Sequence, residues 1–227
     1  MTALFDIPRP TLAVVGSTDR FPVRRIYCVG RNYVDHIREM KEGDERDLPF
    51  FFQKPTDAIV ETGNRVPYPR ATDDFQYEGE LVVAIGREAL DVPVESALEN
   101  VFGYAAGIDF TRRDRQREAF REGRPWEVGK AFDASAPCGP ITPASQASHV
   151  ADAQLTVTVN GETRQHTTLD LMIWDVPEII SNLSRQYRLA PGDLIYTGTP
   201  AGVGPVVSGD VLTVEVTGLA ALEVAIA

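Results

Sequence analysis

The stretch Tyr77-Glu-Gly-Glu-Leu-Val-Val-Ala-Ile85 alternates like a β-strand with one charged and one apolar face. Side chains along a strand point to opposite faces with a period of two, so Glu78 and Glu80 share a face and Leu81 begins the apolar set on the other. Two neighbouring carboxylates on a strand that enters a core repel each other unless they bind a cation or a proton. A solvated strand end explains the pair equally well, so the spacing alone leaves metal binding and a wet edge open.

Working outward, short strands dominate the rest of the chain. Asn160-Gly161 is the favoured two-residue hairpin turn between two of them. A helix is predicted from Pro177 to Gln186 with Asp175 as its N-cap, a second near Pro93 to Asn100, and a third at 112–121. Strands are predicted at 26–30, 50–54, 77–85, 101–109, 155–159, 162–165, 194–197 and 211–216. Because strands outnumber helices and do not alternate regularly with them, we predict a mostly β protein with a few helices (α+β) and an antiparallel or mixed sheet.

Length and charge bound the remaining possibilities. A chain of 227 residues suits one domain, which we place at 21–227 after a short N-terminal extension at 1–20. With 22 basic and 33 acidic residues, the net charge of −11 argues against a nucleic-acid or anionic-membrane partner. No apolar run reaches the roughly 18 residues that a membrane span needs, and the start resembles no signal peptide. We expect a cytoplasmic protein in which Cys28 and Cys138 are buried and reduced.

A third carboxylate, Asp109, directly follows the apolar run Val101–Ile108. A carboxylate at the end of a buried strand is costly unless it is paired. The competing interpretation is that Asp109 is the N-cap of a helix over 111–116. If Asp109 joins Glu78 and Glu80, three carboxylates favour a hard divalent cation, Mg²⁺, Mn²⁺ or Ca²⁺, over zinc.

Two further candidates carry proton chemistry. His36 and Glu39 are three residues apart, so on a helical turn they face the same side, and a histidine held by a carboxylate can act as a general base. A surface ion pair on a helix has the same spacing. Lys130 lies in the apolar segment Val128–Phe132, which suits either a buried ammonium with a specific partner or a stem that follows apolar surface to water.

Taken together, these segments resemble the fumarylacetoacetate hydrolase family, in particular its small single-domain branch. The resemblance runs from about Ile26 to the C-terminus. The segments that carry it occur in the family's order: Gly30–Met40, Phe52–Pro55, Tyr77–Leu81, Gly107–Gln116, Gly129–Asp133 and Thr197–Gly204.

The resemblance implies a mixed β-sandwich roll, a homodimer and a divalent metal, Mg²⁺ or Mn²⁺, which Ca²⁺ could replace in a crystal. It also assigns roles to nine residues. The metal ligands are Glu78, Glu80 and Asp109, the catalytic residues are His36, Glu39 and Lys130, and the substrate-binding residues are Arg113, Gln116 and Thr199.

The implied reaction is metal-dependent hydrolysis of the C–C bond of a 2,4-dioxo acid. His36, oriented by Glu39, would activate water, and the metal would stabilise the pyruvate enolate that leaves. The stretch 31–60 is most similar to fumarylpyruvate hydrolases of the gentisate pathway, which release fumarate and pyruvate. Arg31, Lys41 and Arg46 are the candidate cations for the second carboxylate of that substrate, and 41–48 is either an ordinary loop or a lid.

Other functions stay open. Within the family, the alternatives are an oxaloacetate decarboxylase and a broad acylpyruvase. Isomerisation or decarboxylation of a dienedioate is less favoured, because such proteins are often fused repeats and this chain contains no repeat. A catalytically inactive, metal-stabilised binding protein would not need His36 and Glu39 together with Lys130, Arg113 and Gln116.

Overall fold

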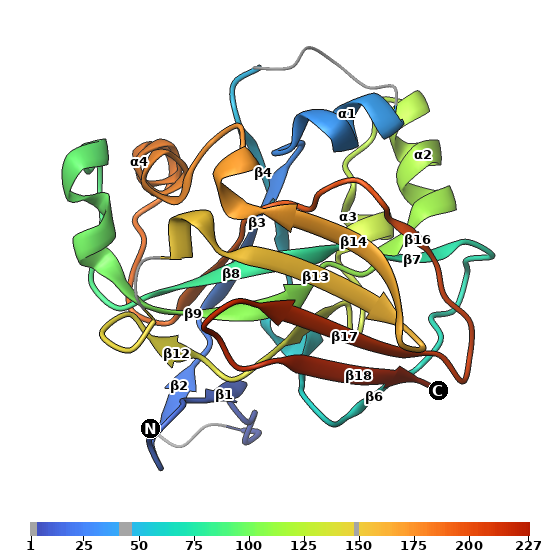
Figure 1. Ribbon diagram of the computed structural model, residues 1–227, viewed down its shortest axis with the longest axis horizontal. Helices are drawn as coiled ribbons and strands as arrows, with labels where there is room; N and C mark the ends of the chain where they lie inside the picture. Colours follow the sequence, from blue (N-terminus) through green and yellow to red (C-terminus); the bar gives the residue numbers. More distant parts are fainter. Residues whose placement is uncertain (1–3, 41–46, 148–149) are drawn as a thin grey trace.

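Two β-sheets face each other across the main hydrophobic core of the computed structural model, which describes residues 4–40, 47–147 and 150–227 (Figure 1). The larger sheet has eight strands and the smaller five. The larger sheet runs in the order β4 (Phe50–Lys54), β3 (Arg25–Gly30), β15 (Asp193–Tyr196), β8 (Gly79–Ile85), β9 (Val101–Ile108), β11 (Ala136–Cys138) and β5 (Ile59–Glu61), with β12 (Thr142–Pro143) also on β9. The smaller runs β14 (Glu162–Thr168), β13 (Gln154–Val159), β17 (Val211–Val216), β18 (Leu222–Ile226) and β6 (Arg65–Val66).

The sheets are mixed, as predicted. The pairs β15–β3, β11–β5 and β18–β6 are parallel, and the other pairs in these two sheets are antiparallel. Two small sheets complete the described strands. One joins β10 (Thr111–Arg112), β7 (Phe75–Tyr77) and β16 (Gly204–Pro205), and the other is the hairpin of β1 (Thr11–Ala13) and β2 (Arg20–Pro22). The predicted mostly β fold is therefore confirmed.

Helices α1 (Val34–Met40) and α2 (Arg113–Arg121) lie side by side at the top of Figure 1, with α3 (Glu127–Lys130) beneath α2. The fourth helix, α4 (Val176–Gln186), begins one residue before the predicted Pro177 and has the predicted N-cap, Asp175, whose carboxylate accepts the Glu178 N–H at 2.9 Å. None of the described helices is long and apolar enough to span a bilayer.

The predicted helix at 93–100 is a 3₁₀ segment, η2 (Val94–Asn100), and not an α-helix. The Asn100 amide donates to the carbonyls of Ser96 and Ala97, which ends the segment one residue before β9. Three single-turn 3₁₀ segments also occur: η1 (Thr56–Ala58), η3 (Val150–Asp152) and η4 (Leu169–Leu171).

The decisive strand differs from its prediction in two ways. It breaks at Glu78, because β7 pairs in the three-stranded sheet while β8 joins the large one. Both of its faces are also buried. Leu81 and its apolar partners pack in the core between the two large sheets, whereas Val82 packs in a second core on the opposite face. The wet-edge interpretation is therefore wrong: Glu78 and Glu80 are only 5% and 1% exposed.

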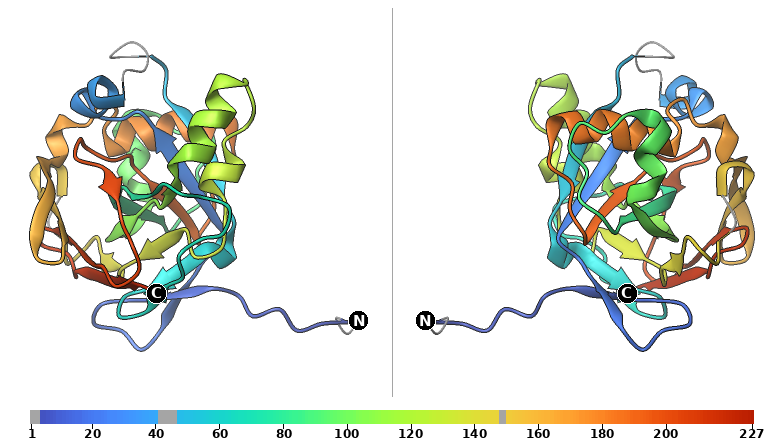
Figure 2. Two further views of the ribbon diagram at one scale, coloured as in Figure 1. Left: turned by 90° about the vertical axis from the view of Figure 1, so that its right-hand side faces the viewer. Right: turned by 90° about the vertical axis from the view of Figure 1, so that its left-hand side faces the viewer.

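The N-terminal hairpin closes that second core. Leu12 and Phe21 from β1 and β2 pack beside Cys28, which is buried and free as predicted, as is Cys138. The residues before β1 leave the body as an extended arm (Figure 2). The domain boundary at residue 20 stays a prediction.

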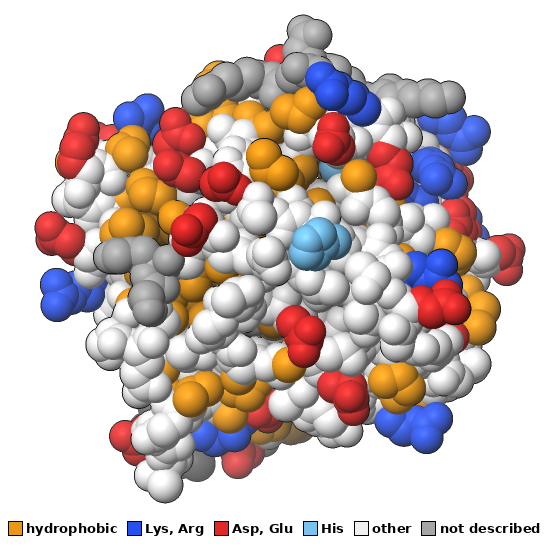
Figure 3. All heavy atoms as spheres, in the orientation of Figure 1, with side chains coloured by type: hydrophobic (Ala, Val, Ile, Leu, Met, Phe, Trp, Pro, Cys, Tyr) orange, Lys and Arg blue, Asp and Glu red, His pale blue; other side chains and the backbone are white. Residues whose placement is uncertain are grey.

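An apolar hollow lies between η2 and α4, where Figure 3 shows hydrophobic side chains gathered on the surface. Leu98, Met172 and Val176 line it, and Leu81 forms part of its floor. Because Leu81 points to the opposite face of β8 from Glu80, the large sheet separates this hollow from the carboxylates.

Candidate active site

Antiparallel pairing of β8 with β9 brings the three predicted carboxylates together. Glu80 pairs with Gly107 in the register, and the Asp109 N–H donates to the Glu78 carbonyl at 2.8 Å. One oxygen of each carboxylate lies within 4.8 Å of the others, and all three residues are buried. The N-cap interpretation of Asp109 is wrong, because α2 begins at Arg113 and Arg112 occupies its cap position.

Lys130 is a buried ammonium with specific partners. Its Nζ donates to Glu78 Oε2 at 2.6 Å, to Asp109 Oδ2 at 2.8 Å and to Thr111 Oγ1 at 2.7 Å. Burial lowers the pKa of Lys130, but the negative charges of Asp109 and Glu78 outweigh it and raise the pKa above its ordinary value. The surface-stem alternative is therefore wrong, and Lys130 is charged where it meets the carboxylates.

Two more cations complete the arrangement. Arg113 donates from Nη2 to Glu78 Oε1 at 2.5 Å. Lys54 places its Nζ 2.8 Å from Asp109 Oδ1, and donates to the backbone carbonyls of Phe110 and Lys130. Three acidic and three basic side chains, all buried, thus form a charged cluster whose formal charges cancel: Glu78, Glu80, Asp109, Lys54, Lys130 and Arg113.

Within the charged cluster, the acids are not equally compensated. Burial alone would raise the pKa of Glu78, but the charges of Lys130 and Arg113 hold it well below its ordinary value. Burial raises the pKa of Glu80 well above its ordinary value, and the neighbouring carboxylates of Asp109 and Glu78 raise it further. Glu80 is therefore the carboxylate that most lacks a positive partner.

This arrangement fits a divalent cation. The donor set is three carboxylates, and hard divalent ions such as Mg²⁺ and Mn²⁺ prefer oxygen ligands. A cation bound by Glu78, Glu80 and Asp109 would supply the positive charge that Glu80 lacks. Replacing a proton on Glu80 by such a cation removes the cost of crowding three carboxylates in a buried site.

The loop from Thr197 to Gly204 closes the site from the side of β15. The Gly198 N–H donates to Glu80 Oε2 at 2.8 Å. Gly198 has a φ of +95°, and a Cβ there would lie 2.7 Å from the Asn32 Cβ, so glycine is required for this N–H to face the carboxylate. Thr199 follows, and its hydroxyl donates to the Gly79 carbonyl and accepts from Gln165.

The predicted His36–Glu39 pair forms on α1. His36 Nδ1 lies 3.4 Å from Glu39 Oε2, and His36 is only 8% exposed. Both Glu39 oxygens accept the Gly202 N–H at 3.2 Å. The hydrogen bond with His36 lowers the pKa of Glu39, with a further contribution from Gly202. The surface-pair interpretation is wrong for the histidine, because His36 is buried and lines the cavity, whereas Glu39 is partly exposed on the solvent side of the pair.

The substrate-binding candidates of α2 are also inside. Arg113 is 1% exposed and donates to Gln76 Oε1 at 2.9 Å and to Gln116 Oε1 at 2.6 Å. Since Gln116 uses its oxygen to accept from Arg113, its amide N–H groups are what it can offer a ligand.

One cavity unites eight of the nine predicted site residues; Glu39 is the exception and lines a neighbouring hollow instead. The cavity is lined by His36, Glu78, Glu80, Asp109, Arg113, Gln116, Lys130 and Thr199. Phe52 and Trp126 line it too. With Phe50, whose ring centroid lies 5.1 Å from that of Trp126, they form the aromatic wall.

Two residues of the site escaped the sequence analysis. Lys54 could have been suspected, because a scarce lysine ends the strand Phe50–Lys54 on the same face as Phe52. Asn32 gave no local signal: its amide bridges to the Trp174 and Thr197 carbonyls and accepts the Trp174 N–H. Residues 41–46, with Lys41 and Arg46 and most of the proposed lid, lie outside the described part of the chain.

Comparison with known proteins identifies the same family that the sequence motifs resemble. Residues 25–227 match the family described as "Fumarylacetoacetate (FAA) hydrolase C-terminal". A fumarylpyruvate hydrolase from Ralstonia sp is 45% identical over 78% of this chain and 92% of its own. The mitochondrial oxaloacetate tautomerase FAHD1 of Arabidopsis thaliana is 38% identical over 88% of this chain and 89% of its own. The fumarylpyruvate hydrolase of Pseudomonas aeruginosa, solved with Mn²⁺ and pyruvate, superposes with a TM-score of 0.96 at 49% identity over 99% of both chains.

Proposed function

The chain belongs to the fumarylacetoacetate hydrolase family, and we propose that it is a metal-dependent hydrolase that cleaves fumarylpyruvate into fumarate and pyruvate. One observation carries the proposal. A buried carboxylate triad that fits a divalent cation shares a single cavity with a histidine held by a carboxylate. The Pseudomonas aeruginosa relative binds Mn²⁺ and pyruvate, a metal and a product that this reaction requires.

Glu78, Glu80 and Asp109 would hold the metal. When bound, a divalent cation acts as a Lewis acid that stabilises the negative charge developing on a pyruvate enolate. Lys130 and Arg113 keep Glu78 ionised, and Lys130 also pairs with Asp109. These cations therefore preserve the charged form of the carboxylates that the metal needs.

His36 is the proposed general base. Because its Nδ1 faces Glu39, an N–H at that position leaves Nε2 with a free lone pair. Nε2 removes a proton from water, and the resulting hydroxide attacks the C4 carbonyl of the 2,4-dioxo acid. When the C3–C4 bond breaks, fumarate leaves with the new oxygen, and the proton returns from His36 to C3 of pyruvate. Gln116 supplies N–H donors where oxyanion charge builds, as such sites require. The three N–H groups of Lys130 already donate to Glu78, Asp109 and Thr111, so Lys130 acts on that charge through its own positive charge.

The test is turnover of fumarylpyruvate by the purified protein, before chelation, after chelation, and after addition of Mg²⁺ or Mn²⁺. Acetylpyruvate and oxaloacetate are assayed beside it. We expect metal-dependent release of fumarate and pyruvate, with a kcat/KM well above that for oxaloacetate. Absent or metal-independent cleavage would contradict the proposal.

A second candidate is oxaloacetate chemistry, either decarboxylation or the tautomerisation named for the Arabidopsis relative; a broad acylpyruvase is the third possibility within the family. A site that stabilises an enolate serves decarboxylation equally well, but decarboxylation needs no attack by water. His36→Ala should therefore spare release of CO₂ from oxaloacetate and abolish hydrolysis. If instead the protein is an inactive, metal-stabilised binding protein, chelation should lower its melting temperature without any turnover to lose.

The proposal extends to the setting of the enzyme. Fumarylpyruvate hydrolysis belongs to the gentisate pathway, and we place the protein in the cytoplasm as a homodimer. Light scattering on a size-exclusion column tests the dimer, which would elute at twice the 24.9 kDa of one chain.

A further inference from the structure

Strand β4 connects the two ends of the cavity. Phe50, Phe52 and Lys54 alternate with the other residues of the strand and so share a face. Lys54 meets Asp109 in the charged cluster, and Phe52 lies 5.3 Å from Lys130 Nζ. Since a strand rises about 3.3 Å per residue, Phe50 lies roughly 13 Å along the strand from Lys54. The cavity runs from the charged cluster past Phe52 and Trp126 to Arg31, and Phe50 lines an adjoining hollow that also contacts Arg31.

Arg31 stands at the far end of that path. Gly30 pairs with Phe50 in the β3–β4 register, so Arg31 follows directly. Its guanidinium carbon lies 5.6 Å from the ring centroid of Phe50 and 5.6 Å from that of Phe120. Cation–π contacts on two rings hold the charged group in place. Arg31 also lines the same cavity as His36 and Lys130.

The backbone at Arg31 has an unusual conformation that the neighbouring residue holds in place. Arg31 has a φ of 59°, in the left-handed region that non-glycine residues rarely adopt. Its neighbour Asn32 is 1% exposed, and three side-chain hydrogen bonds fix it to Trp174 and Thr197. A positive φ at a non-glycine residue is strained, and it persists only where surrounding contacts hold the backbone in that conformation. Such residues are concentrated at ligand sites.

The charges of the cavity identify what Arg31 can bind. Among the described residues that line the cavity, the lysines and arginines are Arg31, Arg113 and Lys130. Arg113 and Lys130 are committed to Glu78 and Asp109 within the charged cluster. Arg31 is thus the lining cation that lies outside the cluster, separated from it by the aromatic wall.

We propose that Arg31 selects dicarboxylic 2,4-dioxo acids by binding the carboxylate farthest from the metal. The inference rests on the proposed function and names the specificity determinant of the same site. The two carboxylates of such a substrate lie at opposite ends of an extended carbon chain. The end that becomes pyruvate lies at the charged cluster, and the flat unsaturated segment lies against Phe52 and Trp126, which line the cavity. The second carboxylate reaches the Arg31 guanidinium.

The test compares kcat/KM for fumarylpyruvate and for acetylpyruvate, which lacks the second carboxylate. Arg31→Gln keeps the Cβ and therefore the same backbone strain. A hydrogen bond to a charged group supports an expected loss of about 10- to 100-fold for fumarylpyruvate, with acetylpyruvate nearly unchanged. Arg31→Lys retains the charge and should recover part of the loss, which also covers the case in which Arg31→Gln does not fold.

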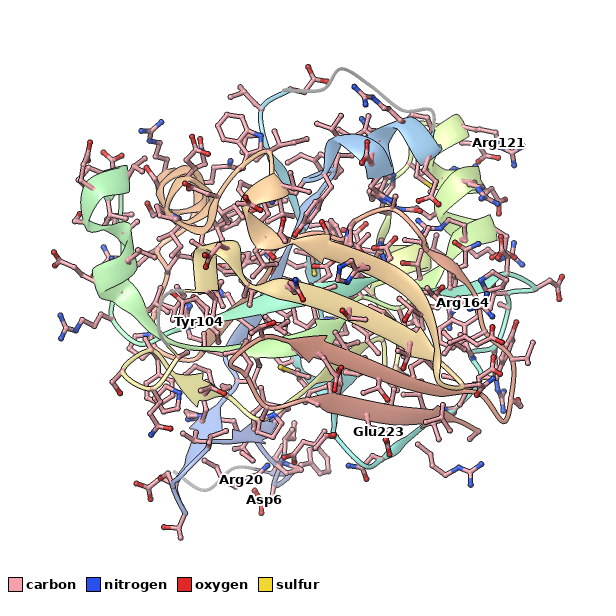
Figure 4. The ribbon with its side chains drawn as sticks, in the orientation of Figure 1. Asp6, Arg20, Tyr104, Arg121, Arg164 and Glu223 are labelled. Atoms are coloured by element: carbon pink, nitrogen blue, oxygen red, sulfur yellow. The ribbon has the colours of Figure 1, made fainter. Side chains whose placement is uncertain are left out.

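Arg121→Gln is the matched control, because Arg121 lies on α2 beside Phe120 and points outward (Figure 4). It should leave the ratio of the two kcat/KM values unchanged. Equal losses on both substrates, no loss with Arg31→Gln, or a selective loss with Arg121→Gln would overturn the inference while the proposed function stood. Hydrolysis of neither substrate by the wild-type protein would overturn the proposed function, and this inference with it.

Discussion

The two ends of the cavity are built by different means. At the charged cluster, buried ions hold one another with hydrogen bonds and ion pairs of 2.5 to 2.8 Å. At the aromatic wall, half-buried rings pack at centroid distances of 5.1 and 6.0 Å, and the Arg31 guanidinium lies 5.6 Å from the Phe50 ring centroid. Removing one of the cations of the charged cluster leaves a buried carboxylate with a partner fewer, whereas removing a ring of the aromatic wall leaves only a contact unmade.

This difference suggests that the charged cluster serves the bond-cleaving step and the aromatic wall serves discrimination between substrates. Buried, mutually paired ions are expensive to alter one at a time, so the charged cluster suits a step that related enzymes share. The rings and Arg31 can change with small losses in stability, so they suit discrimination between substrates. Substitutions at the two ends should therefore fall into two classes: large losses on all substrates, and small losses on some.

Glu80→Gln should have the largest effect. The substitution keeps an oxygen that can accept the Gly198 N–H but removes one negative charge from the metal triad. We expect turnover of every substrate to fall to background. The chelated variant should nevertheless melt above the chelated wild type, because burial and the neighbouring carboxylates disfavour an ionisable group at this position and glutamine carries none. About 2–4 °C accompanies each kcal/mol in a chain of this size. Calorimetry and turnover on the same samples check both, and a variant with substantial turnover would contradict the assignment.

His36→Asn should come next. Loss of a general base typically costs about 10²–10⁴ in kcat, and the loss should be similar for fumarylpyruvate and acetylpyruvate because both require water attack. Binding of Mn²⁺, measured calorimetrically, should survive because His36 is not among the triad. Near wild-type kcat in this variant would exclude the histidine as base, and a loss confined to fumarylpyruvate would assign it to selection.

Lys54→Met should reduce both stability and turnover. Lys54 is 3% exposed and its Nζ pairs with Asp109, so the variant leaves a buried carboxylate with one partner fewer. Breaking a buried ion pair costs about 3–5 kcal/mol. The matched control is Lys130→Met, which removes two carboxylate partners and should cost more. Denaturant unfolding measures both, and an unchanged midpoint for Lys54→Met would show that Lys130 alone suffices for Asp109.

The charged cluster also shows which features the sequence could predict. The alternation around Glu80 and the apolar run before Asp109 are local patterns, so the sequence could single out these carboxylates. Their common role as metal ligands came from the family resemblance, because the local patterns left other interpretations open. The ammonium of Lys54 meets the carbonyls of residues 56 and 76 positions away, and no local pattern records that. The break at Glu78 was equally hidden, since side-chain alternation continues through it although β7 and β8 join different sheets.

The aromatic wall was less predictable for the same reason. Trp126 is the N-cap residue of α3 and follows a polar stretch of the sequence. Its contact with Phe50 and Phe52 arises only in the folded chain. Arg31 stood among three candidate cations, and its sequence neighbours do not reveal its positive φ. Strand periodicity places Glu78 with Glu80 in the cluster and Phe50 with Phe52 in the wall. The positions of Arg31 and Trp126 depend instead on how a turn, a strand and a helix meet.

Gly30→Ala should have the smallest effect and test the wall directly. A Cβ at Gly30 would lie 2.0 Å from the Phe50 ring, so the ring must move and the support beneath Arg31 is lost. Overpacking of this kind costs about 1–3 kcal/mol, less here because Phe50 is only partly buried and can swing outward. We expect kcat/KM for fumarylpyruvate to fall no more than about tenfold, and acetylpyruvate to change little because the charged cluster is untouched.

Phe50→Leu separates the clash from the loss of the ring. Leucine also removes the cation–π contact with Arg31, but it leaves room for the new Cβ, so the double variant Gly30→Ala/Phe50→Leu should be no worse than Phe50→Leu alone. Residues in contact give such non-additive results. Additive losses would mean that Gly30 and Phe50 act independently. Equal losses on both substrates would mean that the wall supports the charged cluster itself, and the division between chemistry and selection would then fail at this position.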